Sequence, residues 1–200
     1  MRVFAALAGL YAAAVGLGML SAPGYRHASG IVDLGHHVVP SLREAVGERT
    51  AEWVWWLGTL PLELFFVVIA GVVLLAGTGA RLALCLYAMY ALHWLFLLAT
   101  TLPAPDHIVW RFPDGIVTLG NPTERDLWFS GHVANAFVIA LATRGSRRWV
   151  QAIAWGGVAF ETLLVLSTRT HYSIDVIGAL FIGYTTHRIS LDLVAPGEAA

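Results

Sequence analysis

The first candidate for chemistry is a histidine followed four residues later by an aspartate, His171 and Asp175 in "RTHYSIDVIG". On a helix, residues four apart lie on the same face, one turn from each other. An aspartate placed there can accept the hydrogen of one imidazole nitrogen and leave the other nitrogen available as a nucleophile or base. A purely structural pair at the mouth of a membrane span would have the same spacing. The pair alone therefore does not decide between the two roles.

A second histidine stands in "DLWFSGHVANAF", residues 126–137. Ser130 can cap a helix that starts here, and Gly131 lets the backbone approach a ligand closely. His132 then lies on the first turn of that helix. A capped helix start with one stray polar residue is the structural alternative.

The composition is that of a membrane protein. The chain has 200 residues, of which 58% are hydrophobic and only 12% charged. A membrane span needs ~20 largely apolar residues, so a chain of this length holds about six spans and little else. The net charge of -1 argues against a nucleic-acid partner, because no basic face exists to neutralise a phosphate backbone.

Six apolar runs predict an all-α, polytopic membrane fold, a single domain over residues 1–200 with six transmembrane helices. The predicted spans cover residues 3–21, 53–76, 82–102, 128–143, 149–167 and 172–187. The first run also fits a signal peptide, but its length and the poor cleavage site "SAPGY" favour a retained span. Tryptophans near the span ends are expected to anchor at the headgroup layer, namely Trp53, Trp55, Trp56, Trp128 and Trp149.

Arginine distribution predicts the orientation of these spans. If the spans alternate, the long connections 22–52 and 103–127 lie on one side of the membrane, together with the short turn 168–171, and the other short connections lie on the opposite side. Each side has six arginines, but those of the short connections are denser, most of all in "RGSRR". This predicts a multi-pass protein of the bacterial plasma membrane with cytoplasmic termini. His132 and His171 then start helices from the same extracytoplasmic face, at equal depth.

Two histidines at two helix N-termini, one of them backed by an aspartate, suit phosphoryl transfer. The helix ends and their N–H groups favour a phosphate. One imidazole can attack phosphorus while the other protonates the leaving oxygen.

These motifs resemble the sphingomyelin synthase family, a branch of the type 2 phosphatidic acid phosphatase superfamily. That family pairs an aspartate-initiated FSGH segment with an HY[ST]xDV segment two spans later, as "DLWFSGH" and "THYSIDV" do here. "TTLPAP", residues 100–105, resembles the end of the family's preceding span. "VDLGHHVVP", residues 32–40, is a looser likeness to its first exoplasmic loop. The clear resemblance covers about residues 100–190.

The resemblance implies that His171 is the nucleophile of a phosphohistidine intermediate, that Asp175 orients it, and that His132 is the acid and base. It implies neither a metal nor another cofactor. The KxxxxxxRP motif of the phosphatase branch is absent, FSGH replaces PSGH, and Ser167 and Arg169 do not have the phosphatase spacing before His171. These departures favour a headgroup transferase over a lipid phosphatase.

Three charged residues near the motifs are candidates for substrate binding. Arg169 and Arg125 are the nearest cations and can hold phosphate oxygens. Interfacial ion pairs, for example with Asp126, are the structural alternative. Asp126 matches the aspartate that precedes FSGH in the family, which implies a supporting role or a contact to a cationic headgroup.

The predicted spans contain other polar residues. An ionisable group within a membrane span costs free energy, so each of these residues is a candidate for a functional or packing role. Glu161 lies about two turns from the outer end of its span and can project beneath the histidines. Asn135 lies one turn below His132 and can hydrogen-bond it, although a helix-packing amide is the commoner role. Glu63 and His93 lie nearer mid-membrane, where mutual pairing or a packing bond is expected. The loop histidines have no metal-ligand spacing: His36, His37 and His107.

The prediction is a membrane enzyme that cleaves a phospholipid headgroup bond at the outer face. It passes the phosphoalcohol to the hydroxyl of a lipid acceptor such as diacylglycerol or a ceramide, or to water. A lipid phosphate phosphatase is the alternative from the same superfamily. A non-catalytic lipid-binding or transport bundle is the alternative from another class, and such a protein has no need of an aspartate behind one histidine.

Overall fold

The computed structural model describes residues 31, 33–76, 80–99, 102–109 and 128–193. Every regular element in those ranges is an α-helix, which confirms the all-α fold class. The helices are α2 (Leu34–Val38), α3 (Leu42–Val46), α4 (Glu48–Ala76), α5 (Ala80–Ala99), α6 (Gly131–Ala142), α7 (Arg148–Ser167) and α8 (Ser173–Leu193). The predicted first span, residues 3–21, lies outside the described residues.

The helices α4 to α8 coincide with five of the predicted apolar runs, but two of them are longer than the runs. Helix α4 begins at Glu48 rather than at residue 53, and α8 continues to Leu193 rather than ending at residue 187. Hydropathy marks only the apolar part of a helix, whereas backbone hydrogen bonds carry the helix on into polar sequence. By length and composition, one helix of the described part, α7, can cross a membrane, and α6 is a shorter apolar helix.

The long connection before α4 contains local structure that hydropathy did not predict. The carboxylate of Asp33 accepts the N–H of His36 and caps α2, and the hydroxyl of Ser41 accepts the N–H of Glu44 and caps α3. Such side chains satisfy backbone N–H groups that a helix start leaves without a partner. As a result, two single-turn helices replace part of the expected loop.

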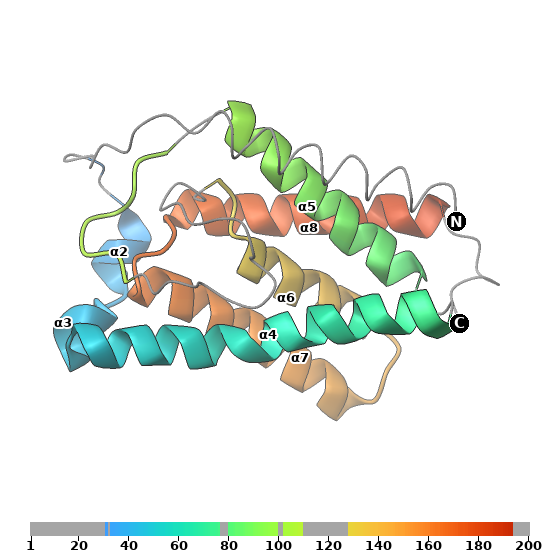
Figure 1. The fold of residues 1–200 in the computed structure, drawn as a ribbon, viewed down its shortest axis with the longest axis horizontal. Coiled ribbons are helices and arrows are strands. Elements are labelled where there is room, and N and C mark those ends of the chain that lie inside the picture. Colours follow the sequence, from blue (N-terminus) through green and yellow to red (C-terminus); the bar gives the residue numbers. More distant parts are fainter. Residues whose placement is uncertain (1–30, 32, 77–79, 100–101, 110–127, 194–200) are drawn as a thin grey trace.

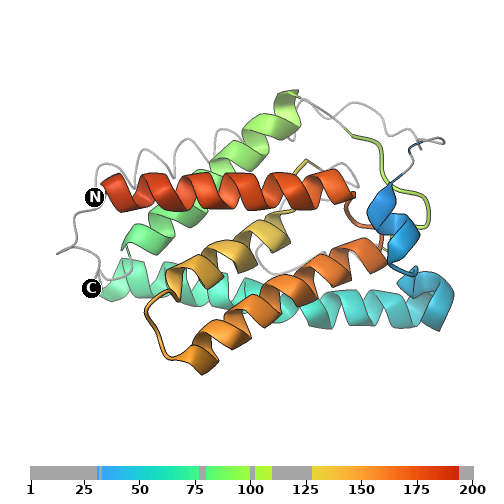
Figure 2. The ribbon, with the colours of Figure 1, turned by 180° about the vertical axis from the view of Figure 1, so that it is seen from behind.

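The long helices form a bundle in which α6 lies between α7 and α8 and packs against both. Helix α8 also packs against α5, and α4 lies alongside α6 and α7. The short helices α2 and α3 gather at one end of the bundle, where α7 ends and α8 begins (Figures 1 and 2). That end therefore brings together α2 and the His171 motif, while α6 begins deeper in the bundle, at its end nearer to α2 (Figures 1 and 2).

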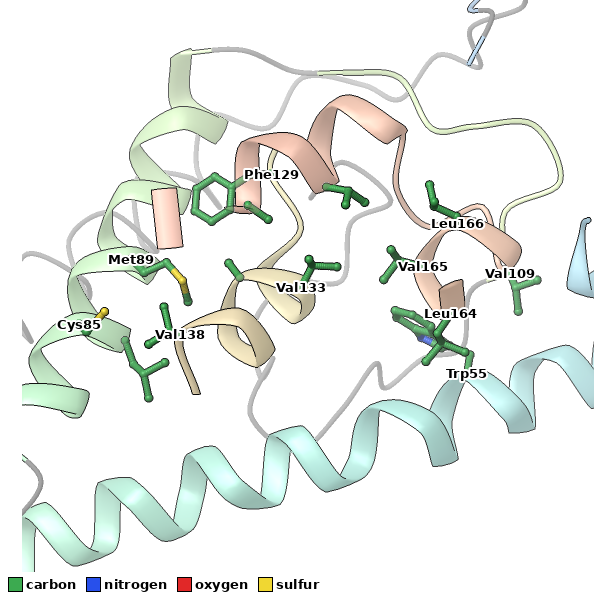
Figure 3. Close-up of a cluster of buried hydrophobic side chains, with 14 of the residues drawn as sticks. Trp55, Cys85, Met89, Val109, Phe129, Val133, Val138, Leu164, Val165 and Leu166 are labelled. Carbon is green, nitrogen blue, oxygen red and sulfur yellow. The ribbon is translucent and has the colours of Figure 1, made fainter. Parts of the chain in front are cut away.

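Buried apolar side chains fill the bundle and join its helices in one cluster (Figure 3). Phe129 and Val133, beside the start of α6, share one cluster with Trp55 of α4, Met89 of α5 and Val165 of α7. In lipid, the fit of such side chains holds helices together more than the removal of apolar surface from water does.

The outside of the bundle is apolar, and several ionisable groups are inside. Glu63, His93, Glu161 and Asp175 are buried, while Phe181 of α8 is 71% exposed. Other large exposed hydrophobic side chains on α7 and α8 are Trp149, Ile153, Trp155, Phe160, Leu163, Ile174, Ile177, Tyr184, Ile189 and Leu193. An apolar outer face on this scale suits contact with lipid chains rather than with water.

Helices α4 and α7 approach closely at Gly58, and this contact gives a first prediction. A Cβ at Gly58 would lie 2.6 Å from Leu164 Cδ2 and 3.3 Å from Phe160 Cζ. Gly58→Leu should therefore push the two helices apart and cost about 1–3 kcal/mol of stability. Thermal unfolding in detergent measures the effect. Gly156→Leu is the matched control, because a Cβ there meets nothing within 4 Å; equal losses in both variants would contradict the contact.

Candidate active site

The carboxylate of Asp175 organises the start of α8. Its Oδ2 accepts the backbone N–H of Tyr172 at 2.8 Å and lies 3.5 Å from Nδ1 of His171. Tyr172 is the residue before the first helical position and Asp175 is the third helical residue, so the carboxylate reaches back as in a capping box. Asp175 is fully buried and His171 is nearly so. This geometry holds the carboxylate in place behind the imidazole.

The structure corrects one detail of the spacing argument. His171 does not lie on α8 but in the turn before it, two residues ahead of Ser173. The pair therefore meets because the carboxylate of Asp175 points back toward the helix start, and not because both side chains share one helical face. The predicted proximity is confirmed, although its structural cause is different.

The first turn of α6 lies against the start of α8. The hydroxyl of Ser130 accepts the N–H of Val133 at 3.3 Å, which confirms the predicted helix cap. The backbone N–H of Ser130 donates to the carbonyl oxygen of Asp175 at 3.1 Å. This bond links the FSGH segment directly to the segment of His171 and Asp175. A Cβ at Gly131 meets nothing within 4 Å among the described residues.

His132 is half-buried in the first turn of α6, beside a tryptophan of α4. Its ring lies 5.2 Å from that of Trp55, with an angle of 65° between the ring planes. Trp55 is only 2% exposed. The expectation that Trp55 anchors at the headgroup layer is therefore wrong, because the side chain points inward and forms a wall beside His132.

Of the three charged residues predicted to bind substrate, the structure describes only Arg169. Arg169 donates to the carbonyl oxygens of His36 at 2.8 Å and Leu166 at 3.2 Å, and its backbone has a positive φ of 58°. Its guanidinium group thus connects two backbone carbonyl groups close to His171. Arg125 and Asp126 lie outside the described residues.

Glu161 and Asn135 contact neighbouring helices. The carboxylate of Glu161 on α7 is buried and within electrostatic range of Glu63 on α4. The amide of Asn135 donates to the hydroxyl of Tyr90 at 2.7 Å and so joins α6 to α5. His93 packs edge-on against Phe129, with ring centroids 4.9 Å apart.

Helix α2 contributes residues that the sequence reasoning did not select. Asp33 Oδ2 accepts the N–H of Ser173, and Asp33 Oδ1 accepts its hydroxyl, both at 2.8 Å. Burial alone would raise the pKa of Asp33, but these hydrogen bonds and that from the N–H of His36 outweigh it and leave the pKa below 3.8. The only sequence signal for these residues was the loose likeness of "VDLGHHVVP" to a family loop.

A polar cavity of about 280 Å³ opens beside the His171 turn. Its lining combines carboxylates, imidazoles and one guanidinium group, and comprises Ile31, Asp33, His36, His37, Pro105, Asp106, His107, Arg169 and Tyr172. Within the ranges that the structure describes, no three or more His, Cys, Asp or Glu side chains are grouped to hold a metal ion.

The position of His36 predicts how acid affects stability. Burial of its ring lowers the pKa of His36 below 6.5, as does Arg169, and together they outweigh the hydrogen bond to the His171 carbonyl and the charges of Asp33 and Asp175. The unfolded chain then binds the proton more readily, so stability should fall as pH drops through 6.5.

His36→Gln cannot titrate and should lose less stability on acidification than the wild type. Thermal unfolding in detergent at about pH 7.5 and about pH 5.5 measures the difference. His37→Gln, on the exposed side of α2, is the matched control. The same acid-induced drop in wild type and His36→Gln would show that the burial of His36 has no such effect.

Comparison with known proteins now identifies the chain. The profile of the AtPDCT1/2 family matches residues 33–191, well over half of the sequence and every helix from α2 to α7 in full. The chain belongs to the AtPDCT1/2 family. No solved structure matches this AtPDCT1/2 family member significantly.

Curated relatives of this AtPDCT1/2 family member are plant enzymes. Phosphatidylinositol:ceramide inositolphosphotransferase 3 of Arabidopsis thaliana is 26% identical over 123 residues, which cover 50% of this chain and 41% of the relative. The phosphatidylinositol:ceramide inositolphosphotransferases of Oryza sativa, subspecies indica and japonica, are each 32% identical over 87 residues, covering 40% of this chain and 26% of the relative. The chain thus spans less than half the length of these relatives. The match confirms the sphingomyelin synthase-like resemblance and a relation to membrane enzymes that transfer lipid headgroups.

Proposed function

We propose that this protein is a membrane phospholipid headgroup phosphotransferase that acts through His171, His132 and Asp175. The observation that carries the proposal is the hydrogen bond from the Ser130 N–H to the Asp175 carbonyl. It brings the first turn of α6, which holds His132, beside the His171–Asp175 pair. A lipid-binding or transport protein needs polar groups for a phosphate but has no need of a buried carboxylate behind one imidazole.

The proposed reaction has two steps, each a substitution at phosphorus. In the first, Nε2 of His171 attacks the headgroup phosphorus, the bond from phosphorus to the diacylglycerol oxygen breaks, and His132 protonates that oxygen. In the second, His132 takes the proton of an acceptor hydroxyl, the oxygen attacks phosphorus, and the bond to His171 breaks. The acceptor is a lipid hydroxyl, such as that of diacylglycerol or a ceramide, and no cofactor takes part.

Asp175 supports both steps by stabilising the positive charge on the imidazole of His171. The Nδ1 to Oδ2 separation of 3.5 Å exceeds an ordinary hydrogen bond. Catalytic hydrogen bonds are often long before substrate binds and shorten in the complex. The positive end of the α6 dipole lies beside the pair and favours the phosphate.

The proposed arrangement in the membrane has six spans, with residues 3–21 as the first. The termini face the cytoplasm of a bacterial cell and the active site faces outward. Helices α4 to α8 lie within the other five spans, and α6 and α8 both begin at their ends nearer to α2 and α3 (Figure 1). A reporter fused to the C-terminus should be active only as a cytoplasmic reporter, and an extracytoplasmic signal would contradict this orientation.

Headgroup transfer in proteoliposomes tests the proposed function. A phospholipid labelled in its headgroup phosphate is supplied with diacylglycerol or a ceramide as acceptor. The proposal predicts that the label moves to the acceptor lipid. Label released into water as a phosphoalcohol would indicate a phospholipase C-type enzyme, and hydrolysis of phosphatidic acid alone would indicate a phosphatase. No turnover of any of these lipids would favour the non-catalytic alternative.

A further inference from the structure

Helix α2 contacts the His171 turn at three alternate residues. His36 Nε2 lies 2.8 Å from the carbonyl oxygen of His171, and the carbonyl oxygen of His36 accepts from Arg169 at 2.8 Å. Two residues beyond His171, Ser173 bonds to Asp33 through both its N–H and its hydroxyl. The short helix α2, with its cap residue, therefore contacts the turn at the proposed nucleophile and at one residue on either side of it.

The carboxylate of Asp33 joins two helix starts. Its Oδ1 accepts the N–H of His36 at 3.0 Å and so caps α2, while its Oδ2 accepts the N–H of Ser173, the first residue of α8. Asp175 accepts the preceding N–H, that of Tyr172. Two carboxylates thus satisfy two successive backbone donors at the start of α8, and both fix the path of the chain that leaves His171.

The contact between α2 and α8 leaves no room for a side chain at residue 35. The N–H of Gly35 donates to the hydroxyl of Ser173 at 2.8 Å. A Cβ at Gly35 would collide with the Ser173 hydroxyl and lie 3.2 Å from Leu166 Cδ2. A glycine at this position allows the backbone of α2 to approach the start of α8. The ring of His36 also lies against that of Tyr172, with centroids 5.5 Å apart.

We propose that Asp33 and His36 are positioning residues that hold the backbone of the His171 turn, so that the imidazole stays aligned with Asp175. We call these contacts of Asp33 and His36 with the His171 turn the clamp. The catalytic consequence of the clamp rests on the proposed function, whereas the clamp itself is a structural claim. A displacement of about 1 Å in a reacting group can cost about 10²-fold in rate. The His171 turn is irregular backbone between α7 and α8 and lacks the regular hydrogen bonds of a helix. The hydrogen bonds from α2 and its cap residue therefore hold this turn in place.

Steady-state kinetics on matched variants test the catalytic part. Asp33→Ala should lower kcat about 10- to 100-fold while KM stays within about twofold, because substrate contacts are kept but the nucleophile is misaligned. Ser173→Ala should lower kcat in the same direction, and Ser173→Thr, which keeps the hydroxyl, should restore it. The double variant Asp33→Ala/Ser173→Ala should lose little beyond Asp33→Ala, because both changes break one contact. Glu48→Ala, which removes an exposed carboxylate paired with Arg43, is the control.

Amide hydrogen exchange tests the clamp without reference to turnover. Residues 169–176 should exchange faster in Asp33→Ala and Ser173→Ala than in the wild type, Ser173→Thr or Glu48→Ala, while α7 stays unchanged. If Asp33→Ala cannot be purified in a folded state, Asp33→Asn and Ser173→Ala serve in its place. Unchanged exchange in this segment overturns the clamp, and variants that keep the kcat of an active wild type overturn its catalytic consequence. An inactive wild type with the predicted exchange contradicts the proposed function alone.

Discussion

His171→Ala should lower headgroup transfer by about 10⁴-fold or more, since the variant lacks the group that forms the covalent bond to phosphorus. Alanine should not unfold the protein, because the side chain lies in a turn and the N–H of Tyr172, bonded to Asp175, is kept. The rate of label transfer between lipids in proteoliposomes measures the effect. Binding of the donor phospholipid should change far less than the rate, since the bond from His171 to phosphorus forms only in the chemical step.

His187→Gln is the matched control for this variant. His187 is a buried histidine of α8, about 21 Å along the helix from its start at Ser173 by helical rise, and so far from the His171 turn. Its replacement should leave transfer near the wild-type rate. Transfer by His171→Ala at a rate like that of His187→Gln would rule out His171 as the nucleophile.

Asp175→Asn should lower kcat by about 10³- to 10⁴-fold, as loss of the orienting carboxylate does in hydrolase triads. The amide keeps one oxygen that can accept the N–H of Tyr172, so the start of α8 should remain formed and the loss of stability should be about 1 kcal/mol. The amide cannot stabilise a positively charged imidazole. Steady-state kinetics and thermal unfolding on the same preparation separate the two effects.

Asp192→Asn removes a carboxylate from the exposed far end of α8 and is the control for Asp175→Asn. It should change neither kcat nor the unfolding temperature. A similar kcat in both variants, or a loss of activity in Asp175→Asn explained wholly by unfolding, would show that Asp175 is a helix cap and nothing more.

The local features of the site were predictable because they depend on residues close in the sequence. The cap at Ser130 follows from a hydroxyl three residues before the N–H that it accepts. The approach of Asp175 to His171 follows from a separation of four residues, although the turn before α8 was not foreseen. Both features are set by short stretches of chain, whose geometry offers few alternatives.

The contribution of α2 was not predictable, because it depends on contacts between distant parts of the chain. Asp33 and Ser173 are 140 residues apart, and nothing in the hydropathy of residues 33–40 indicates that they meet. Trp55 was misplaced for a similar reason. Its position near a span end suggests the headgroup layer, but packing against His132 and the core turns it inward.

Apolar runs predicted the helices but not their ends. Helix α8 continues through Arg188 to Leu193 because its backbone hydrogen bonds do not require apolar side chains. The side-chain bonds that join the helices, such as that from Asn135 to Tyr90, depend on which faces meet. Those faces are set by the whole bundle, so no single apolar run determines them.

Trapping the covalent intermediate tests the central claim most directly. The protein is mixed with a phospholipid labelled at its headgroup phosphate, in the absence of acceptor, and quenched under alkaline conditions, which preserve a phosphorus–nitrogen bond. Peptide mapping then locates the label. The account predicts label on the peptide that contains His171, in the wild type and not in His171→Ala. Label on another residue, or no labelled protein from a preparation that transfers the headgroup when acceptor is supplied, would contradict it.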